Sequence, residues 1–301
     1  MLNVENSSII TGNPHFLKPR NIFNKRSLSV LRILDRKMRD YSRKDYYNAV
    51  SELVNVITQK YGNRIRSIYA GGSFARDDFV PGRSDIDIYI VVENRKSEIW
   101  KDLQREALEI EKKYFNELKS VFGEVLGVSV TTLEEIQEGK SFLGAGFEYS
   151  NFVREGKLLW GEDVRKFIPK PSPERQKESA RKYLDQVYGL VSNQERIFKW
   201  LKWVPFKLVP KKRKLRWTRE AFSLIFRTAA LFLGSRGINV SRKEDITSAF
   251  RQQIQKNELC DIIFSTLLLW EKWKSSPLTD KETKKLVENS LKFVKGLQSL
   301  H

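Results

Sequence analysis

The stretch that most constrains this chain is a glycine-rich turn followed by two aspartates on a strand. It reads GGSFARDDFVPGRSDIDIYIV and runs over residues 71–91. Side chains two residues apart on a strand point to the same face, so Asp85 and Asp87 point together. Ile86, between them, faces a core. Because two adjacent carboxylates repel each other unless a cation lies between them, the stretch predicts a cation site at the edge of a buried strand.

The rest of the stretch supplies groups that suit a phosphate. Mg²⁺ prefers oxygen ligands and commonly keeps waters and substrate phosphates, and Mn²⁺ is the alternative ion. Gly71 and Gly72 permit a close backbone approach to a phosphate, and Ser73 adds a hydroxyl. Arg76 and Arg83 can neutralise charge on a polyphosphate. The competing interpretation is an ordinary turn and a solvated strand edge, with Arg83 as the salt-bridge partner of an aspartate.

Hydrophobic periodicity divides the chain into a mixed part and a helical part. Strands are expected at 65–70, 85–92 and 124–132, with helices at 44–61 and 97–120 around them. Thr132 is expected to cap the helix of LEEIQEG that follows the last of these strands. Beyond two prolines, Pro171 and Pro173, only helical patterns recur. These are expected at 174–200, 216–235, 242–256, 258–273 and 279–298.

These patterns predict an α+β fold in which a small mixed sheet with flanking helices is followed by an all-α bundle. The expected domains are a basic N-terminal arm and helix at 1–42, a core domain at 43–172 and an all-helical substrate or partner domain at 173–301. Cys260 is the only cysteine, so no disulfide framework is expected. The chain start lacks the pattern of a signal peptide, and no apolar run is long enough to span a bilayer. We therefore expect a cytoplasmic protein.

Around the aspartate pair the sequence resembles the nucleotidyltransferase superfamily, which is DNA polymerase beta-like and includes the kanamycin and streptomycin adenylyltransferases and the minimal nucleotidyltransferases. The signature of that family is a strand, Gly-Ser, and an Asp-x-Asp on the next strand after ten or so residues. Here it stands as Gly72-Ser73 and, after eleven intervening residues, Asp85-Ile86-Asp87. A weaker likeness lies in FVREGKLLWGEDVR at 152–165, which resembles the segment that often ends the core domain of this family.

The resemblance implies a fold, a reaction and a set of roles. The reaction is a Mg²⁺-dependent transfer of a nucleoside monophosphate, with ATP as the expected donor, to a hydroxyl, and pyrophosphate is released. Asp85 and Asp87 are the implied metal ligands and catalytic residues. Gly72 and Ser73 are the implied contacts of the triphosphate tail, and Arg76 is a further phosphate contact.

The chain departs from the family pattern at one position. The family often carries a third carboxylate on the strand after the long helix, where it acts as a general base. The matching residue here is Gly127, and no acidic residue shares its face. Glu124, Glu148 and Glu155 are the candidate substitutes. The other hypotheses are that two carboxylates suffice, or that the chain has lost turnover and acts as a nucleic-acid-binding or regulatory module.

Positive charge is concentrated in the helical part of the chain. The formal net charge is +18, and residues 176–301 alone carry 26 basic and 12 acidic side chains. Such asymmetry favours a polyanionic partner and argues against a polycationic aminoglycoside acceptor. RNA, DNA or a protein partner fits better, and RNA or protein is the expected acceptor.

The densest basic segment, 198–219, holds nine basic residues and no acid. Cations there give salt-sensitive affinity for phosphates, and interleaved tryptophans can stack on unpaired bases. The predicted polyanion-binding residues are Lys211, Lys212, Arg213, Lys214, Arg216 and Trp217. A lysine-rich loop with core tryptophans and a membrane-surface segment are the alternative interpretations.

Overall fold

The computed structural model describes residues 40–94, 97–138, 140–141, 147–201, 206–254 and 258–300. The chain divides into two compact units. The core unit contains residues 41–119 and 124–172, and the helical unit contains residues 120–123 and those from 173 onward. The predicted arm lies outside the described residues up to position 39. The domain boundaries expected from the sequence stay predictions.

The core unit is built on a mixed four-stranded sheet with the order β3-β2-β1-β4. Its strands are β1 (Ile65–Gly71), β2 (Ile86–Val92), β3 (Leu126–Thr132) and β4 (Lys157–Gly161). β1 is antiparallel to β2 and β4, whereas β2 and β3 are parallel. The sheet and the helices after it confirm the predicted α+β fold. The sequence did not predict β4, because KLLWG does not alternate between apolar and polar residues.

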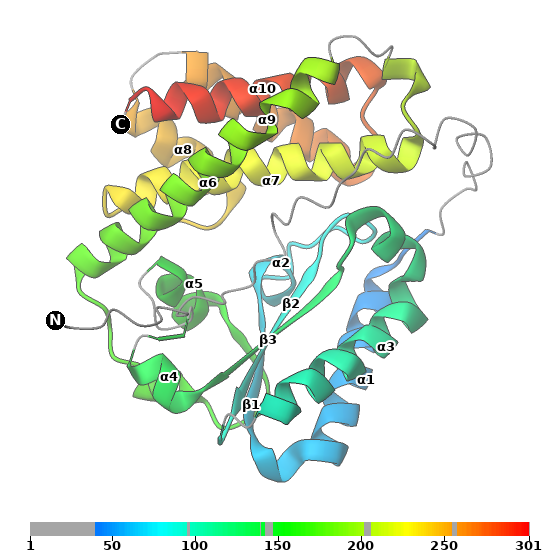
Figure 1. The fold of residues 1–301 in the computed structure, drawn as a ribbon, viewed down its shortest axis with the longest axis vertical. Coiled ribbons are helices and arrows are strands. Elements are labelled where there is room, and N and C mark those ends of the chain that lie inside the picture. Colours follow the sequence, from blue (N-terminus) through cyan, green and yellow to red (C-terminus); the bar gives the residue numbers. More distant parts are fainter. Residues whose placement is uncertain are drawn as a thin grey trace, which may run out of the picture. The chain divides into compact units, whose positions relative to one another are not determined.

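Helices cover both faces of this sheet. Figure 1 shows α1 (Arg43–Tyr61) and α3 (Ser97–Phe122) along one face, and α4 (Leu133–Gln137) and α5 (Phe147–Glu155) along the other. Short local signals fix two of the starts. Ser42 and Asp45 form a reciprocal capping box before α1, and the predicted cap Thr132 does the same with Glu135 before α4. The remaining short elements are η3 (Gly62–Arg64), α2 (Gly72–Ala75) and η5 (Val164–Phe167).

The two faces of β2 differ as the sequence predicts. Ile86, Ile88 and Ile90 are fully buried on one face. The other face carries Asp87 and then Tyr89, and Tyr89 packs against a cluster that includes Phe152 of α5. The start of β2 therefore presents carboxylates on the same face that α5 covers further along the strand.

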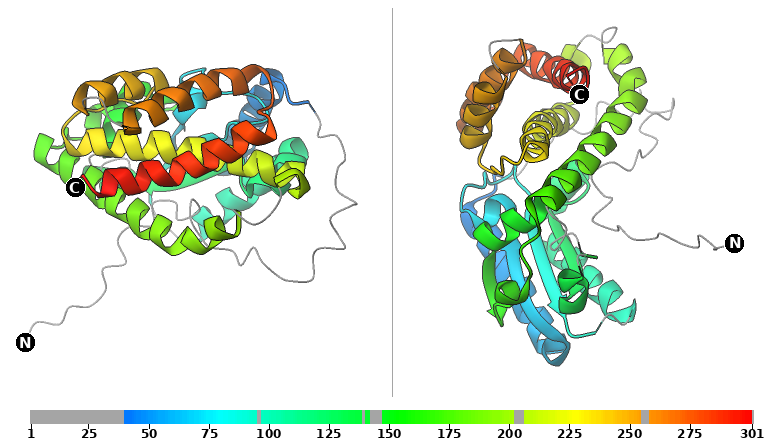
Figure 2. Two further views of the ribbon diagram at one scale, coloured as in Figure 1. Left: turned by 90° about the horizontal axis from the view of Figure 1, so that it is seen from above. Right: turned by 90° about the vertical axis from the view of Figure 1, so that its left-hand side faces the viewer.

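The described residues of the helical unit form a bundle without strands. Its elements are α6 (Pro173–Leu201), η6 (Phe206–Leu208), α7 (Lys211–Ser235), α8 (Lys243–Gln253), α9 (Glu258–Ser275) and α10 (Asp280–Gln298). α7 packs against each of the other long helices, and Figure 2 shows it beside α10. In the described part of the chain, every helix is too short or too polar to cross a bilayer.

α7 begins at Lys211, five residues before the predicted start at 216. The first turn is KKRK, which shows no apolar stripe, so periodicity did not reveal it. Lysine and arginine nevertheless have good helix propensity. The residues predicted to bind a polyanion are therefore helical rather than part of a loop.

Candidate functional site

The two aspartates lie where the alternation of β2 predicts. Asp85 directly precedes β2 and Asp87 is its second residue; both are partly buried. Asp87 pairs with Gly71 of β1 on one side and with Gly127 of β3 on the other. Because paired residues of neighbouring strands share a face, neither neighbouring strand sets a side chain beside this carboxylate. Across the sheet, Asp87 of β2 therefore lies between a glycine of β1 and a glycine of β3.

The glycines of the turn make room for site side chains. Gly72 has a φ of +57°, and a Cβ built there would lie 2.5 Å from Oδ2 of Asp87. A Cβ at Gly71 would lie 2.3 Å from Cε2 of Tyr89. The sequence predicts that these glycines let a phosphate approach the backbone closely. The structure adds a second reason, since any side chain here collides with Asp87 or Tyr89.

Arg76 and Glu155 come from separate segments and meet in the structure. Arg76 donates from Nη1 to Oε2 of Glu155 at 2.9 Å and from Nε to Oδ2 of Asp78 at 3.1 Å. Burial alone lowers the pKa of Arg76, but the two carboxylates raise it above its ordinary value. The predicted phosphate contact and one candidate base thus form an ion pair that ties α5 to the segment after α2.

The other residues that the sequence predicts for the site lie on several different segments of the core unit. Ser73 is the second residue of α2, and its carbonyl accepts a hydrogen bond from the backbone of Asp78 at 3.1 Å. Arg83 lies in the turn before β2, and burial lowers the pKa of its guanidinium. Glu124 lies two residues before β3. Glu148 belongs to α5, but its side chain lies outside the described residues.

The third carboxylate of the family pattern is absent at the matching register position. Gly127 pairs directly with Asp87, so the sequence alignment to this residue agrees with the strand pairing. Within the described ranges, no three Asp, Glu, His or Cys side chains gather as a metal site. The carboxylate of Asp87 therefore faces a glycine, and not an acidic residue, at the paired position of β3.

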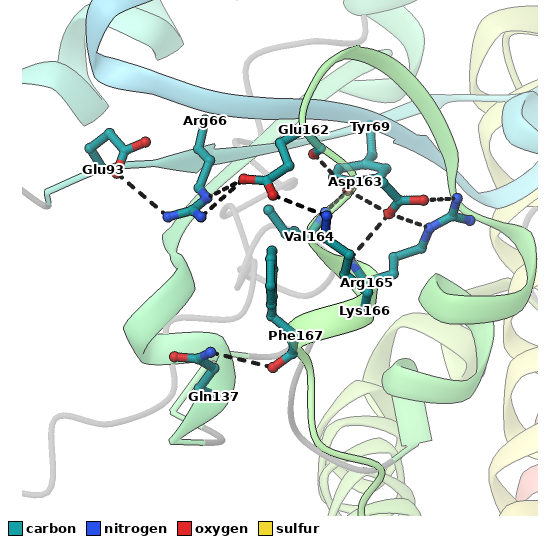
Figure 3. A network of polar contacts seen from close by, with 10 residues as sticks. All are labelled: Arg66, Tyr69, Glu93, Gln137, Glu162, Asp163, Val164, Arg165, Lys166 and Phe167. Carbon is teal, nitrogen blue, oxygen red and sulfur yellow. Dashed lines mark hydrogen bonds and ion pairs between the residues drawn. The ribbon is translucent and has the colours of Figure 1, made fainter.

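A polar network that the sequence did not reveal fixes the chain after β4 (Figure 3). The hydroxyl of Tyr69, on β1, donates to Oδ1 of Asp163 at 3.0 Å and accepts from the backbone N–H of Val164 at 2.7 Å. Arg165 contacts both carboxylate oxygens of Asp163 and donates to the carbonyl of Gly156 at 2.8 Å. The network holds the residue that follows Glu155, and the only sequence signal was the family-like segment 152–165.

This network has opposite effects on its two titratable groups. Burial raises the pKa of the Tyr69 phenol to about 12. Hydrogen bonds from Arg165 hold the pKa of Asp163 well below its ordinary value. A carboxylate with a depressed native pKa stabilises the fold fully above its unfolded pKa of about 4. This contribution declines progressively below that pH and is gone only when the pH has fallen through the lower native pKa.

Asp163→Asn is therefore expected to destabilise the protein at neutral pH and much less in acid. Because Asp163 is partly exposed and screened by water, we expect a loss of about 1 kcal/mol at pH 7 that becomes clearly smaller near pH 2, where the native carboxylate also begins to be protonated. Urea unfolding at both pH values measures the difference. Glu109→Gln, which removes an exposed carboxylate of α3, is the control and should change stability little at either pH. An equal loss at both pH values for Asp163→Asn contradicts the charge argument.

The predicted polyanion-binding residues all lie in the first two turns of α7. Lys214 is ion-paired with Asp280 of α10 at 2.7 Å, and Arg216 with Glu220 at 2.7 Å. The Trp217 ring lies 6.1 Å from that of Phe206. The side chain of Trp200 and all of Trp203 lie outside the described residues. Lys211 is exposed, whereas Lys212 and Arg213 are partly buried.

Three comparisons with known proteins bear on this arrangement. Residues 50–158 match the family model described as Nucleotidyltransferase domain. A search of curated protein sequences found no match. Among solved structures, spectinomycin adenyltransferase AAD(9) from Enterococcus faecialis, crystallised with ATP and spectinomycin, matches with a TM-score of 0.51. The identity is 12%, over 83% of this chain and 99% of that one, so the likeness is one of fold.

The family match spans the Gly-Ser turn, the aspartate pair and Gly127 together. It confirms the resemblance on which the sequence interpretation rests. The chain contains a nucleotidyltransferase domain at residues 50–158.

Proposed function

We propose that this protein is a metal-dependent nucleotidyltransferase that moves AMP from ATP to a hydroxyl acceptor and releases pyrophosphate. The observation that supports it most is the strand register, in which Asp87 pairs with Gly71 and Gly127 beside the turn that carries Gly72. The family match adds the reaction class. ATP as the donor draws support from the spectinomycin adenyltransferase that was crystallised with it.

The residues at the start of β2 fit Mg²⁺ or Mn²⁺. Asp85 and Asp87 supply two hard oxygen ligands on one face, and such ions take water and phosphate oxygens at their other positions. The described residues include no histidine, so this part of the chain offers no imidazole ligand for zinc. When bound, the metal would neutralise negative charge on the transferred phosphate and on the acceptor oxygen.

The chain's own groups then have distinct tasks. Asp85 and Asp87 hold the metal at the sheet edge, and Gly72 and Ser73 contact the triphosphate tail from the adjoining turn. Arg76 contacts a phosphate only if it exchanges Asp78 or Glu155 for a phosphate oxygen. Until then it orients the turn by holding it to α5.

Glu155, one candidate for the general base, is engaged by Arg76. Because Glu155 already accepts a hydrogen bond from Arg76, one of its oxygens is occupied by a guanidinium. Glu124 and Glu148 stay candidates from the sequence alone. We favour a reaction in which the two metal-binding carboxylates suffice, with the acceptor hydroxyl activated at the metal.

Charge guides the proposed acceptor. Residues 176–301 carry 26 basic and 12 acidic side chains, which favours RNA or an acidic protein over a cationic small molecule. The four cations that open α7 oppose the helix dipole, an arrangement that a bound polyanion relieves. We therefore propose that the helical unit binds the acceptor.

One observation favours a second candidate function. Gly127 pairs with Asp87 where related domains often carry their base. A chain that has lost turnover could keep the fold and act as a nucleic-acid-binding or regulatory module. The retained aspartate pair and Gly-Ser turn favour catalysis, because nucleic-acid binding alone requires neither.

A transfer assay separates the two functions. The purified chain is incubated with Mg²⁺ and each α-³²P-labelled NTP, with and without total RNA and protein from its source. Label from ATP in RNA or protein supports the proposal and identifies the acceptor class. Label in a small molecule keeps the transferase and overturns the acceptor. No label in any fraction, together with tight RNA binding, supports the second function.

Neutralising the first three cations of α7 is expected to weaken the salt dependence of RNA binding. The triple variant Lys211→Gln, Lys212→Gln and Arg213→Gln keeps the Lys214–Asp280 ion pair. The slope of log K against log salt should become shallower by about 0.7 for each phosphate that the variant no longer neutralises. Lys207→Gln, which removes the charge of an exposed lysine of η6, is the comparison variant for the loss of a single positive charge. An unchanged slope in the triple variant contradicts a polyanion-binding role for this segment.

A further inference from the structure

The segment between the Gly-Ser turn and the aspartate pair is held by a buried tyrosine of α1. Tyr46 is fully buried. Its hydroxyl donates to the carbonyl of Ser84 at 2.9 Å and accepts from the backbone N–H of Gly82 at 3.0 Å. Ser84 is the residue before Asp85, so this contact fixes the peptide that leads into the metal-binding pair.

The position of the tyrosine hydroxyl is itself set by packing. The ring of Tyr46 stacks on Phe79 with centroids 4.9 Å apart and contacts Phe115 of α3 at 4.9 Å. The turn it holds is closed internally, since Oγ of Ser84 accepts from the backbone N–H of Val80 at 2.9 Å. The packed ring of Tyr46 therefore contacts an internally bonded turn, and its hydroxyl oxygen forms two hydrogen bonds with that turn.

Asp85 lies closer along the chain to this support than Asp87 does. Asp87 lies inside the sheet and pairs with a residue of both neighbouring strands. The pairing of β2 with β3 begins only at Ile86, so Asp85 lies just outside the paired part of the strand. On the N-terminal side of Asp85, the adjacent carbonyl, that of Ser84, accepts the hydrogen bond from Tyr46.

α1 also holds the other end of this segment. Arg43 and Tyr47 both bond the carboxylate of Asp77, whose φ of 61° is unusual for a residue other than glycine. Arg43 further donates to the carbonyl of Phe79 at 3.4 Å. The segment 77–84 is thus anchored to one helix at both ends.

We propose that Tyr46 is a positioning residue for the metal site, acting through Ser84 on the carboxylate of Asp85. The inference rests on the proposed function for the metal and deepens it, because the Gly-Ser and Asp-x-Asp signature does not include this tyrosine. Partners outside the ligand sphere orient the ligands, and their loss commonly costs about 10- to 100-fold in metal affinity or activity. A tyrosine that served only to stabilise the fold would leave metal affinity unchanged.

The test compares Tyr46→Phe with Tyr114→Phe in the full chain. Both variants keep a ring and lose one hydroxyl that forms a hydrogen bond between elements of the core unit. Tyr114 donates to Glu52 at 2.7 Å, and Glu52 lies further along α1 than Tyr46. Three quantities are measured: exchange of the Gly82 amide in metal-free protein, Mn²⁺ affinity by titration, and kcat with KM for ATP.

For Tyr46→Phe we expect faster exchange at Gly82, Mn²⁺ affinity weaker by about 10-fold and a fall in kcat of similar size. KM for ATP should change little, and Tyr114→Phe should match the wild-type chain in all three. Faster exchange at Gly82 with wild-type Mn²⁺ affinity and kcat overturns the inference alone. A wild-type chain that neither binds Mn²⁺ nor transfers nucleotide overturns the proposed function, and the inference with it.

Discussion

Asp87→Asn is expected to lower nucleotide transfer by at least about 10³-fold while the fold survives. A metal that neutralises phosphate charge contributes several kcal/mol to transition-state stabilisation, and each step of about 1.36 kcal/mol is tenfold in rate. Asparagine keeps the shape of the side chain beside Gly72 but removes the charge that attracts the cation. The loss should therefore appear in kcat and in Mn²⁺ binding, with the thermal midpoint nearly unchanged.

The control for this variant is Asp102→Asn, which removes a carboxylate from α3 that pairs with Arg105 of the same helix. We expect wild-type turnover and wild-type Mn²⁺ affinity. Asp85→Asn should resemble Asp87→Asn, because both aspartates point to one face. Full transfer activity in either site variant contradicts the metal assignment, whereas loss of Mn²⁺ binding in both without loss of folding supports it.

Local pattern was enough to predict the parts of the site that lie along one strand. The alternation of β2 predicts that Asp85 and Asp87 share a face, because a strand has only two faces. The resemblance to the family identified Gly127 as the residue at the position of the third carboxylate, and the parallel register, which pairs Gly127 with Asp87, agrees. Thr132 was predicted as a helix cap from its position before an acidic helix start, and it is one.

Contacts between distant segments could not be predicted in the same way. Arg76 and Glu155 are 79 positions apart, and nothing in either local pattern says that they pair. Tyr46 looks like one more apolar position on the face of α1, since its ring is buried and its hydroxyl role depends on the turn at Gly82. Only the three-dimensional packing shows which polar atom a buried tyrosine meets.

The strongest discrepancy concerns the glycine pair. From the sequence, Gly71 and Gly72 were interpreted through the ligand alone, as points where a phosphate comes close to the backbone. In the structure each also faces a side chain of β2, Tyr89 and Asp87 respectively. A glycine can serve both needs, and the contact with Asp87 can be tested by substitution.

Gly72→Ala is therefore expected to reduce both stability and transfer. The left-handed φ of +57° costs an alanine about 1–2 kcal/mol, and the new Cβ would lie 2.5 Å from Oδ2 of Asp87. One of the two must move, and a displacement of about 1 Å at a reacting centre can cost about 100-fold in rate. Equilibrium unfolding and kcat measure the two effects separately.

Two other glycines separate backbone strain from the collision with the carboxylate. Gly123 has a φ of +86° and Gly62 a helical φ of −53°, and a Cβ at either meets no atom within 4 Å. Gly123→Ala should lose stability from strain alone and keep its kcat, while Gly62→Ala should be neutral or slightly stabilising. If Gly72→Ala behaves like Gly123→Ala, with wild-type kcat, the glycine is required only by the turn. A fall in kcat seen at Gly72 alone shows that backbone strain is not its cause, because strain is common to Gly72 and Gly123. The contacts of Gly72 with Asp87 and with the phosphate tail are then what the alanine disturbs.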